Sequence, residues 1–347
     1  MRLEKCEIHG GNIIVIGDLH LSSSFRGSHK DYTYECYENL QKIQDIVSKE
    51  NASAVIFLGD IVSVGEKNIR DRQFLTRVIS FFLMLNKLTD GNVYAVRGNH
   101  DCGDQSDFDM LMGIGCIKNP KYIDYFGRKP DSSEDDGLEV RFHLVNYGDE
   151  DKSLVITTED NPASDVVLGH AEYYIDGVTN WYSKGHSTEV SSLSNFQGVS
   201  LIVSGHIHDP SDEVLYTTLK DGSSIGLFYP GAPGRVKERY NDCWYLIFQY
   251  VEGDSPEDWS TSYDARFFGL QPAKDVYFAD EEIIGTEEQE EKAEQARKSE
   301  SLTEIVREIM EGRITSGDLY AQIDLVPSSA ESKQIAKKYL EMATLEN

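Results

Sequence analysis

Two histidines separated by one residue, His206 and His208, come directly after an apolar run at 201–203 and the glycine Gly205. Residues two apart on an extended segment share a face, so both imidazoles can reach the same pocket. Imidazoles bind transition metals and transfer protons near neutral pH. This spacing therefore predicts a metal site, a general acid–base site, or both.

The same order of residues occurs four more times upstream: an apolar run, a glycine, and then an acid, an amide or an imidazole. The side chains that follow these runs are Asp18 and His20, then Asp60, then Asn99, His100 and Asp101, and finally His170. One such segment alone is more often an ordinary turn. Five segments of this kind in one chain indicate strand ends that build one shared site.

The donor types favour a site for two divalent metal ions. Carboxylate, imidazole and amide ligands suit Mn²⁺, Fe²⁺ or Zn²⁺, and the lack of cysteine argues against a structural zinc. Two ions about 3.5–4 Å apart need a bridging carboxylate, and they clamp the attacking and leaving oxygens of a phosphate ester. Asp60 is predicted as the bridge. His100 is predicted to protonate or orient the leaving group, with Asp101 fixing its tautomer.

The elements that must position these residues follow from hydrophobic periodicity. Apolar runs at 12–16, 54–58 and 93–96 predict strands, and segments near the 3.6-residue period at 32–50 and 71–87 predict helices between them. This order predicts mostly parallel strands covered by helices. Further strands are predicted at 142–145, 154–156, 166–168, 213–218, 226–229 and 244–250. The expected fold is an α/β sandwich of two sheets flanked by helices, with a C-terminal helical extension.

The composition changes between about residues 254 and 280. We predict a catalytic domain over 1–253, an acidic linker or edge segment over 254–285, and a helical segment over 286–347. In the last segment a narrow apolar stripe runs from Leu302 to Met310. Such a stripe must be covered, either by this chain's own core or by a partner protein.

The chain of 347 residues has a formal net charge of −27, which argues against tight, unaided binding to nucleic acid. Its five scattered cysteines lack metal-site spacing and favour a reduced, cytoplasmic protein. The polar N-terminus is unlike a secretory signal. No apolar run approaches the roughly 20 residues that cross a bilayer, so no membrane association is expected.

The motifs Asp-x-His, Gly-Asp, Gly-Asn-His-Asp, Gly-His and Gly-His-x-His, in this order, resemble the signature of the calcineurin-like metallophosphoesterases over about residues 12–250. The resemblance implies a role for each matching residue. One metal would be held by Asp18, His20, Asp60 and His208, and the other by Asp60, Asn99, His170 and His206. His100 would be the acid–base residue.

Within that superfamily the chain is most similar to the SbcD-type nuclease subunit of DNA repair and recombination complexes, in its compact phage-like form. The similarity is carried by the segments 17–21, 201–208, 229–233 and 241–246 and by a C-terminal pair of predicted helices, one with the stripe at 302–310 and the other at about 332–345. It implies a Mn²⁺-dependent DNA exonuclease and endonuclease in a bacterial or phage-infected cell. It also implies an SbcC-type coiled-coil ATPase as the partner of residues 286–347, and a homodimer is a further possibility. At Ser63 nuclease members often carry an acid or a histidine, a departure from the pattern.

Two other functions are compatible with the sequence. The site could serve a phosphatase or phosphodiesterase for a protein, a nucleotide or another small ester, which suits the negative charge. The chain could also be a non-catalytic adaptor whose charge mimics DNA, although the intact set of metal-binding residues argues against this.

Overall fold

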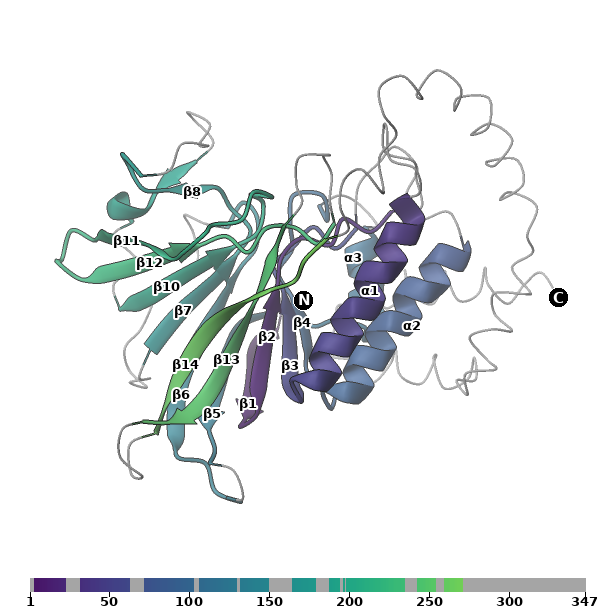
Figure 1. Ribbon diagram of the computed structural model, residues 1–347, viewed down its shortest axis with the longest axis horizontal. Helices are drawn as coiled ribbons and strands as arrows, with labels where there is room; N and C mark the ends of the chain where they lie inside the picture. The colour runs from purple at the N-terminus through teal and green to yellow at the C-terminus, as the bar shows by residue number, and fades with distance from the viewer. Residues whose placement is uncertain are drawn as a thin grey trace.

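The computed structural model describes residues 3–22, 32–62, 72–102, 106–129, 132–149, 164–178, 187–193, 196, 198–234, 242–253 and 259–270. These residues form two main sheets, with two long helices on the outer side of one of them (Figure 1). The predicted α/β sandwich of two sheets with flanking helices is confirmed. Ser63, the strand predicted at 154–156 and the helices predicted within 286–347 lie outside the described residues.

The first sheet has five strands in the order β14-β13-β2-β3-β4. Its three parallel strands alternate with helices along the chain, as predicted, while β13 and β14 are added antiparallel. The strands are β2 (Asn12–Ile16), β3 (Ala52–Phe57), β4 (Val93–Ala95), β13 (Trp244–Glu252) and β14 (Trp259–Phe267). The edge strand β14 lies within the segment predicted as an acidic linker or edge.

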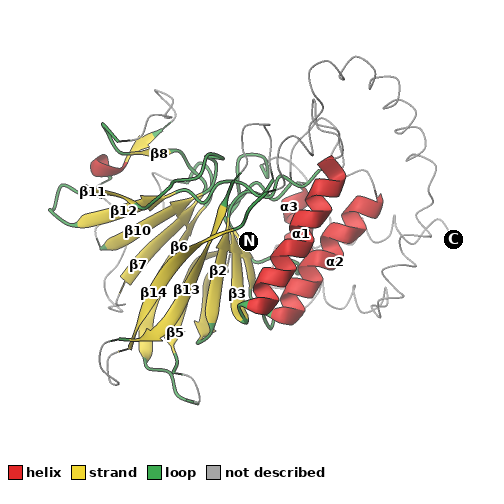
Figure 2. Cartoon of the chain, viewed as in Figure 1, coloured by secondary structure: helices red, strands yellow, loops and turns green. Residues whose placement is uncertain are grey.

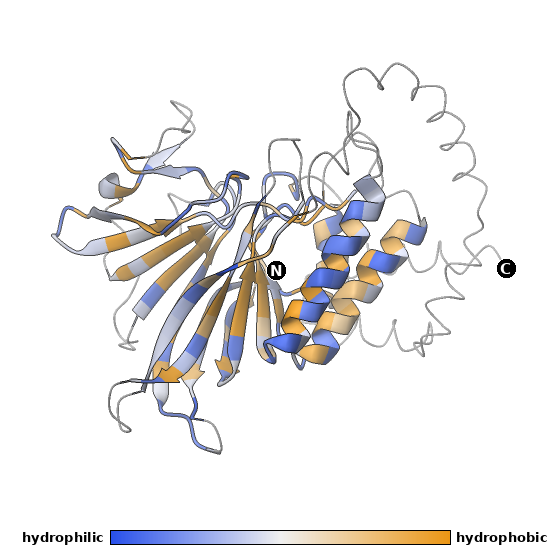
Figure 3. Ribbon diagram, in the orientation of Figure 1, coloured by the Kyte–Doolittle hydropathy of each residue, from blue (hydrophilic) through white to orange (hydrophobic). Residues whose placement is uncertain are grey.

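Helices α1 (Tyr32–Lys49) and α2 (Arg72–Leu88) cover the outer face of this sheet, as Figure 2 shows in red. Side chains alternate along β2, so Ile14 and Ile16 face the helices while Ile13 and Val15 face the second sheet. The sheet is therefore buried on both faces, which is why its parallel strands are almost continuously apolar (Figure 3, orange). A shorter helix, α3 (Asp107–Gly113), follows β4.

The second sheet has seven strands in the order β1-β5-β6-β7-β10-β12-β11. It mixes parallel and antiparallel pairs, as expected for the second half of the chain. The strands are β1 (Leu3–His9), β5 (Pro120–Gly127), β6 (Gly137–Val145), β7 (Ser164–Gly169), β10 (Val199–Ser204), β11 (Leu215–Thr218) and β12 (Ser224–Phe228). Charged residues such as Lys121 and Asp124 interrupt β5, so its sequence pattern predicts no bounds.

The segment between β7 and β10 covers part of the outer face of the second sheet. It contains the two-residue strands β8 (Tyr173–Tyr174) and β9 (Thr188–Glu189) and a short 3-10 helix, Val190–Ser192. Its buried side chains pack against residues from β7, β10 and β12. This packing anchors the chain on both sides of the turn that follows β7.

The inner faces of the two sheets share one apolar core, which fixes the sheets against each other. The ends of β2, β3 and β4 therefore lie opposite the ends of β7 and β10. No helix among the described residues is long and apolar enough to span a bilayer.

Candidate metal centre

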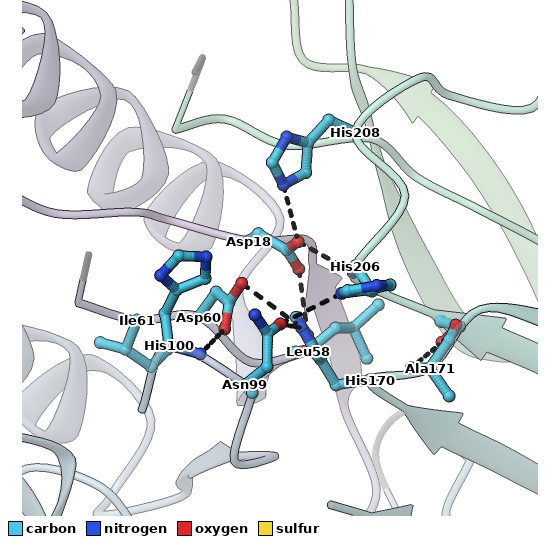
Figure 4. A network of polar contacts seen from close by, with 12 residues as sticks. Asp18, Leu58, Asp60, Ile61, Asn99, His100, His170, Ala171, His206 and His208 are labelled. Carbon is cyan, nitrogen blue, oxygen red and sulfur yellow. Dashed lines mark hydrogen bonds and ion pairs between the residues drawn. The ribbon is translucent and has the colours of Figure 1, made fainter. Parts of the chain in front are cut away.

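All of the side chains predicted to bind metal come together where five strands end, and Figure 4 labels each of them except His20. The first sheet supplies residues after β2, β3 and β4, and the second sheet supplies residues after β7 and β10. These residues are Asp18, His20, Asp60, Asn99, His170, His206 and His208. The described part of the chain thus brings both sheets to one polar cluster at the edge of the shared core.

Asp60 occupies the middle of the cluster. Its Oδ1 accepts a hydrogen bond from the backbone N–H of His100 at 2.8 Å. Its Oδ2 lies 3.7 Å from His20 Nε2 and 3.4 Å from His170 Nε2. One oxygen is held by the backbone while the other faces imidazoles on both sides, which is the placement a bridging carboxylate needs.

Asp18 is held in a similar way at the end of β2. Its Oδ2 accepts from the backbone N–H of His206 at 2.8 Å and lies 3.5 Å from His208 Nε2. Its Oδ1 is buried and receives no hydrogen bond from the described residues, although His170 Nδ1 is 3.6 Å away. A buried carboxylate oxygen without a donor is costly, and a bound cation would compensate it.

The imidazoles of His20 and His208 face each other, with their Nε2 atoms 2.8 Å apart. A hydrogen bond at this distance requires a proton on one of the two nitrogens, because a neutral imidazole has one donor and one acceptor nitrogen. Asp18 Oδ2 lies within 4.0 Å of His20 Nε2. Two imidazoles and a carboxylate oxygen thus surround a single point.

A second group of donors lies on the other side of Asp60. His170 Nδ1 donates to the backbone carbonyl of Leu58 at 2.8 Å, which directs Nε2 into the site. That Nε2 is 2.9 Å from Asn99 Oδ1, and His206 Nδ1 is 3.1 Å from the same oxygen. This half of the site combines imidazole, amide and carboxylate donors.

The buried charges strongly affect one another. Burial alone would lower the pKa of His170, but the negative charges of Asp18 and Asp60 outweigh it and raise that pKa to about 9. Burial would raise the pKa of Asp60, yet its hydrogen bond and charge interaction with His170 hold it well below the usual range. Burial and the nearby His170 lower the pKa of His206. The two carboxylates thus attract positive charge, which a proton on His170 supplies when no cation is bound.

The backbone at the site is unusual. His20, Asp60 and His206 have left-handed φ values of 46°, 44° and 74°, each costing roughly 1–3 kcal/mol in a residue other than glycine. The turns after β2 and β3 support each other, since the N–H of His20 donates to the carbonyl of Asp60 at 2.8 Å. Strain of this kind persists where the surrounding structure holds the chain, and it is common at functional sites.

The glycines before the site residues allow close approach. A Cβ added to Gly98 would lie 2.1 Å from Asp60 Oδ1, and one added to Gly205 would lie 2.2 Å from Asp18 Oδ1. Any other residue at these positions would displace a carboxylate. The glycines before Asn99 and His206 are therefore explained by the space that the two carboxylates occupy, whereas a Cβ at Gly59 would meet the ring of His170 and one at Gly17 the carbonyl of Gly231.

The structure corrects the role predicted for Asp101. Its carboxylate is buried and accepts from the backbone N–H groups of Gly98, Ile61 and Val62, at 3.0, 3.3 and 3.2 Å. No hydrogen bond joins it to the imidazole of His100 among the described residues. Because the chain turns tightly after β4, consecutive side chains diverge, and Asp101 braces the turns after β3 and β4 instead of orienting His100.

Sequence reasoning missed several supporting groups. The carbonyl of Leu58 orients His170, and Ser204 bonds both the N–H and the carbonyl of Ala171, at 3.0 and 2.9 Å. Tyr147, in a turn after β6, places its ring 6.0 Å from that of His206. A backbone carbonyl has no sequence signal, and an aromatic residue after a strand is too common to single out.

The donor set fits divalent metals. Ligand atoms within 4.8 Å of one another come from three overlapping groups: Asp18, His20 and His208; His20, Asp60 and His100; and Asp18, Asp60 and His170. Carboxylates and imidazoles are ligands for Mn²⁺, Fe²⁺ and Zn²⁺. The overlap of the groups at Asp60 and Asp18 suits a pair of ions more than a single ion.

A family model for calcineurin-like phosphoesterases matches residues 11–210 of the chain. This segment contains every predicted metal-binding residue and His100. No curated protein matched in the sequence search. The segment that matches the family model is therefore the part of the chain that holds the candidate site.

Solved structures give weak matches over most of the chain. A dimetal phosphatase from Danio rerio is 11% identical, with a TM-score of 0.43, over 74% of this chain and 96% of that one. NAD nucleotidase from Haemophilus influenzae is 11% identical, with a TM-score of 0.39, over 96% of this chain and 60% of that one. A 5′-nucleotidase precursor from Thermus thermophilus is 12% identical, with a TM-score of 0.38, over 76% of this chain and 57% of that one.

Proposed function

The chain belongs to the calcineurin-like phosphoesterase family and is a metal-dependent phosphoesterase, and we propose that it hydrolyses phosphodiester bonds of DNA with two metal ions. The observation that carries the two-metal part is the placement of Asp60. One of its oxygens is fixed by the backbone, while the other faces His20 on one side and His170 on the other.

In this proposal each side chain has a defined task. Asp18, His20, Asp60 and His208 hold one cation, and Asp60, Asn99, His170 and His206 hold the other. Two divalent cations, when bound, supply Lewis-acid stabilisation for the charge that develops on the phosphoryl oxygens. Mn²⁺ is the metal we propose, because the sites combine oxygen and imidazole donors without thiolates.

His100 is the proposed proton donor to the leaving oxygen. Its backbone N–H is tied to Asp60 Oδ1 at 2.8 Å, so its position is coupled to the bridging carboxylate. Its ring packs edge-on against that of His20, with centroids 5.3 Å apart, and its side chain is partly exposed. An imidazole beside the metal ligands and open to solvent can exchange its proton between turnovers.

DNA as the substrate is supported by the similarity to SbcD-type nucleases. The net charge of −27 works against DNA binding by this chain alone. We therefore propose that an SbcC-type ATPase supplies basic DNA-binding surface and that residues 286–347 bind its coiled coil. Copurification from the native source, with and without residues 286–347, tests this partner. Loss of the ATPase on truncation is expected, and retention would refute the docking segment.

The nuclease assay uses linear duplex DNA with the metal-loaded protein, alone and mixed with the ATPase subunit. We expect Mn²⁺-dependent cleavage, faster in the mixture, and none with Asp60→Asn. No cleavage in either mixture by protein shown to contain two metal ions would refute the DNA substrate. Cleavage that survives Asp60→Asn would indicate a contaminating nuclease.

The acidic charge favours a second candidate, a phosphatase or phosphodiesterase for small esters, which need no extended basic surface. Turnover of chromogenic phosphate monoesters or diesters without DNA cleavage would support it.

A non-catalytic DNA mimic needs carboxylates on its surface. Asp18 and Asp60 are each only 1% exposed, so the site itself gives the mimic no support.

A further inference from the structure

We propose that Tyr147 is a substrate-binding residue whose ring stacks on a nucleobase next to the scissile phosphate, so that the site prefers nucleotide esters to small alkyl esters. This inference rests on the proposed phosphodiesterase function. No motif of the sequence includes Tyr147, which lies in the turn after β6.

Tyr147 lies beside the half of the site formed by His170 and His206. Its ring centroid is 6.0 Å from that of His206, at an interplanar angle of 37°, and 6.3 Å from that of His170, at 73°. The residue is 46% exposed, and its hydroxyl makes no hydrogen bond to the described residues. A large aromatic side chain therefore stands open to solvent directly beside two predicted metal ligands.

The exposure of the other site residues shows on which side the substrate must arrive. Asp18, His20, Asp60 and His170 are buried and form the floor of the site. Asn99, His100, His206 and His208 are partly exposed and form its rim. Tyr147 extends this rim next to His206, so a phosphate bound on the floor would bring its flanking groups close to the tyrosine ring.

The backbone of Tyr147 is held in place by the same turn that carries Asn99 and His100. Its N–H donates to the carbonyl of Arg97 at 2.9 Å. The preceding Asn146 accepts from the N–H of Arg97 at 2.9 Å and from the side chain of Asn119 at 2.9 Å. The backbone from which the ring projects is therefore fixed relative to the metal-binding residues, so that less of the chain has to be ordered when a substrate binds against the ring.

Stacking on a nucleobase explains the exposed ring of Tyr147 better than packing against the neighbouring imidazoles does. Every nucleobase has a π face, so an exposed ring beside a phosphate site binds nucleotides with little sequence preference. The alternative is that Tyr147 only supports the imidazoles, because centroid distances of 6.0 and 6.3 Å are within the range of aromatic pairs. A supporting role would act equally on all substrates and on metal affinity, whereas stacking acts only on substrates that carry a base.

The test compares two chromogenic diesters with the same leaving group, thymidine 5′-(4-nitrophenyl phosphate) and methyl 4-nitrophenyl phosphate. For Tyr147→Ala we expect the ratio of their kcat/KM values to fall by about fivefold or more, mainly through KM of the thymidine ester. Tyr147→Phe should keep the ratio, since the ring remains. The matched control is Tyr216→Ala, which removes a tyrosine that is 60% exposed on β11. It should leave the kcat/KM values for both diesters unchanged.

Calorimetry with the Mn²⁺-loaded protein gives a test that needs no turnover. Tyr147→Ala should weaken binding of thymidine 5′-monophosphate by about fivefold or more and leave inorganic phosphate and Mn²⁺ affinity unchanged. An unchanged preference for the thymidine compounds, or an equal loss for both substrates with weaker Mn²⁺ binding, would overturn the inference. Failure of the wild-type protein to hydrolyse either ester would instead count against the proposed function.

Discussion

The described part of the chain contains two clusters of buried charged side chains that are built in opposite ways. On the outer face of the second sheet, Asp124 accepts from Arg141 Nε at 2.6 Å and Nη2 at 3.1 Å, and it pairs with Lys5 at 2.9 Å. Beside it, His143 pairs with Asp165 at 2.7 Å. In this cluster each carboxylate has a basic side chain of the protein as its partner.

The cluster at the strand ends does not balance its own charges in this way. Asp18 Oδ1, in the middle of Figure 4, lacks a donor among the described residues, and the Nε2 atoms of His20 and His208 face each other. Here the carboxylates of Asp18 and Asp60 have a protonated His170 beside them, and the further imidazole and carboxylate ligand atoms are ones that a bound cation would use. We therefore interpret the cluster at the strand ends as the candidate functional site, and we expect the cluster around Asp124 to serve stability.

The largest effect is expected for Asp60→Asn, which tests whether the cluster at the strand ends binds two metal ions through this residue. An amide cannot bridge two cations as a carboxylate does, so kcat should fall by about 10³-fold or more. Measurement of Mn²⁺ stoichiometry should show fewer than two ions, with an unchanged far-ultraviolet circular dichroism spectrum. Two tightly bound ions in this variant would show that Asp60 is not the bridge.

His100→Gln should separate metal binding from proton transfer within the same cluster. We expect kcat to fall by about 10²–10⁴-fold, the usual contribution of a general acid. The Mn²⁺ stoichiometry measured by calorimetry should stay at two. If the variant lost metal as Asp60→Asn does, His100 would be a ligand and not the proton donor.

Arg141→Met tests whether the buried charged cluster around Asp124 stabilises the fold. Removing one partner of a buried ion pair should lower the free energy of unfolding by about 3–5 kcal/mol, because Asp124 keeps only the partly exposed Lys5. Urea denaturation measures the loss, and kcat/KM in native conditions should not change. The matched control is Arg128→Met, whose pair with Asp135 is partly exposed and should contribute about 1 kcal/mol or less.

The smallest expected effect is the difference that Arg141→Met makes to the stabilisation by added Mn²⁺, and this difference tests whether the clusters are independent. At 100 times its Kd, a metal that binds only the folded chain should raise the free energy of unfolding by about 2.7 kcal/mol per site. Arg141→Met should gain the same increment, because distant sites are additive. An increment that differs clearly between wild type and Arg141→Met would show that the two clusters are coupled.

Much of the site could be predicted because its signals are local. Each side chain predicted to bind metal follows a short apolar run and a glycine, and the runs before Asp18, Asp60, Asn99, His170 and His206 are strand ends in the structure. The role of Asp101 was predicted wrongly because a tight turn sends neighbouring side chains in different directions. Strands β1 and β5 could not be predicted from apolar runs, because one face of each carries the charged cluster that contains Lys5 and Asp124.

The amino-acid sequence by itself determined which donors are available and that each stands at the end of a strand, since hydrophobic period and glycine placement act over a few residues. Only the tertiary structure decided that β2, β3 and β4 end opposite β7 and β10. It also decided which oxygen of Asp60 faces both groups of imidazoles, and that Tyr147 stands at the rim. These facts depend on how two sheets pack through a shared core, which joins residues far apart in the chain and is therefore not written in any single segment.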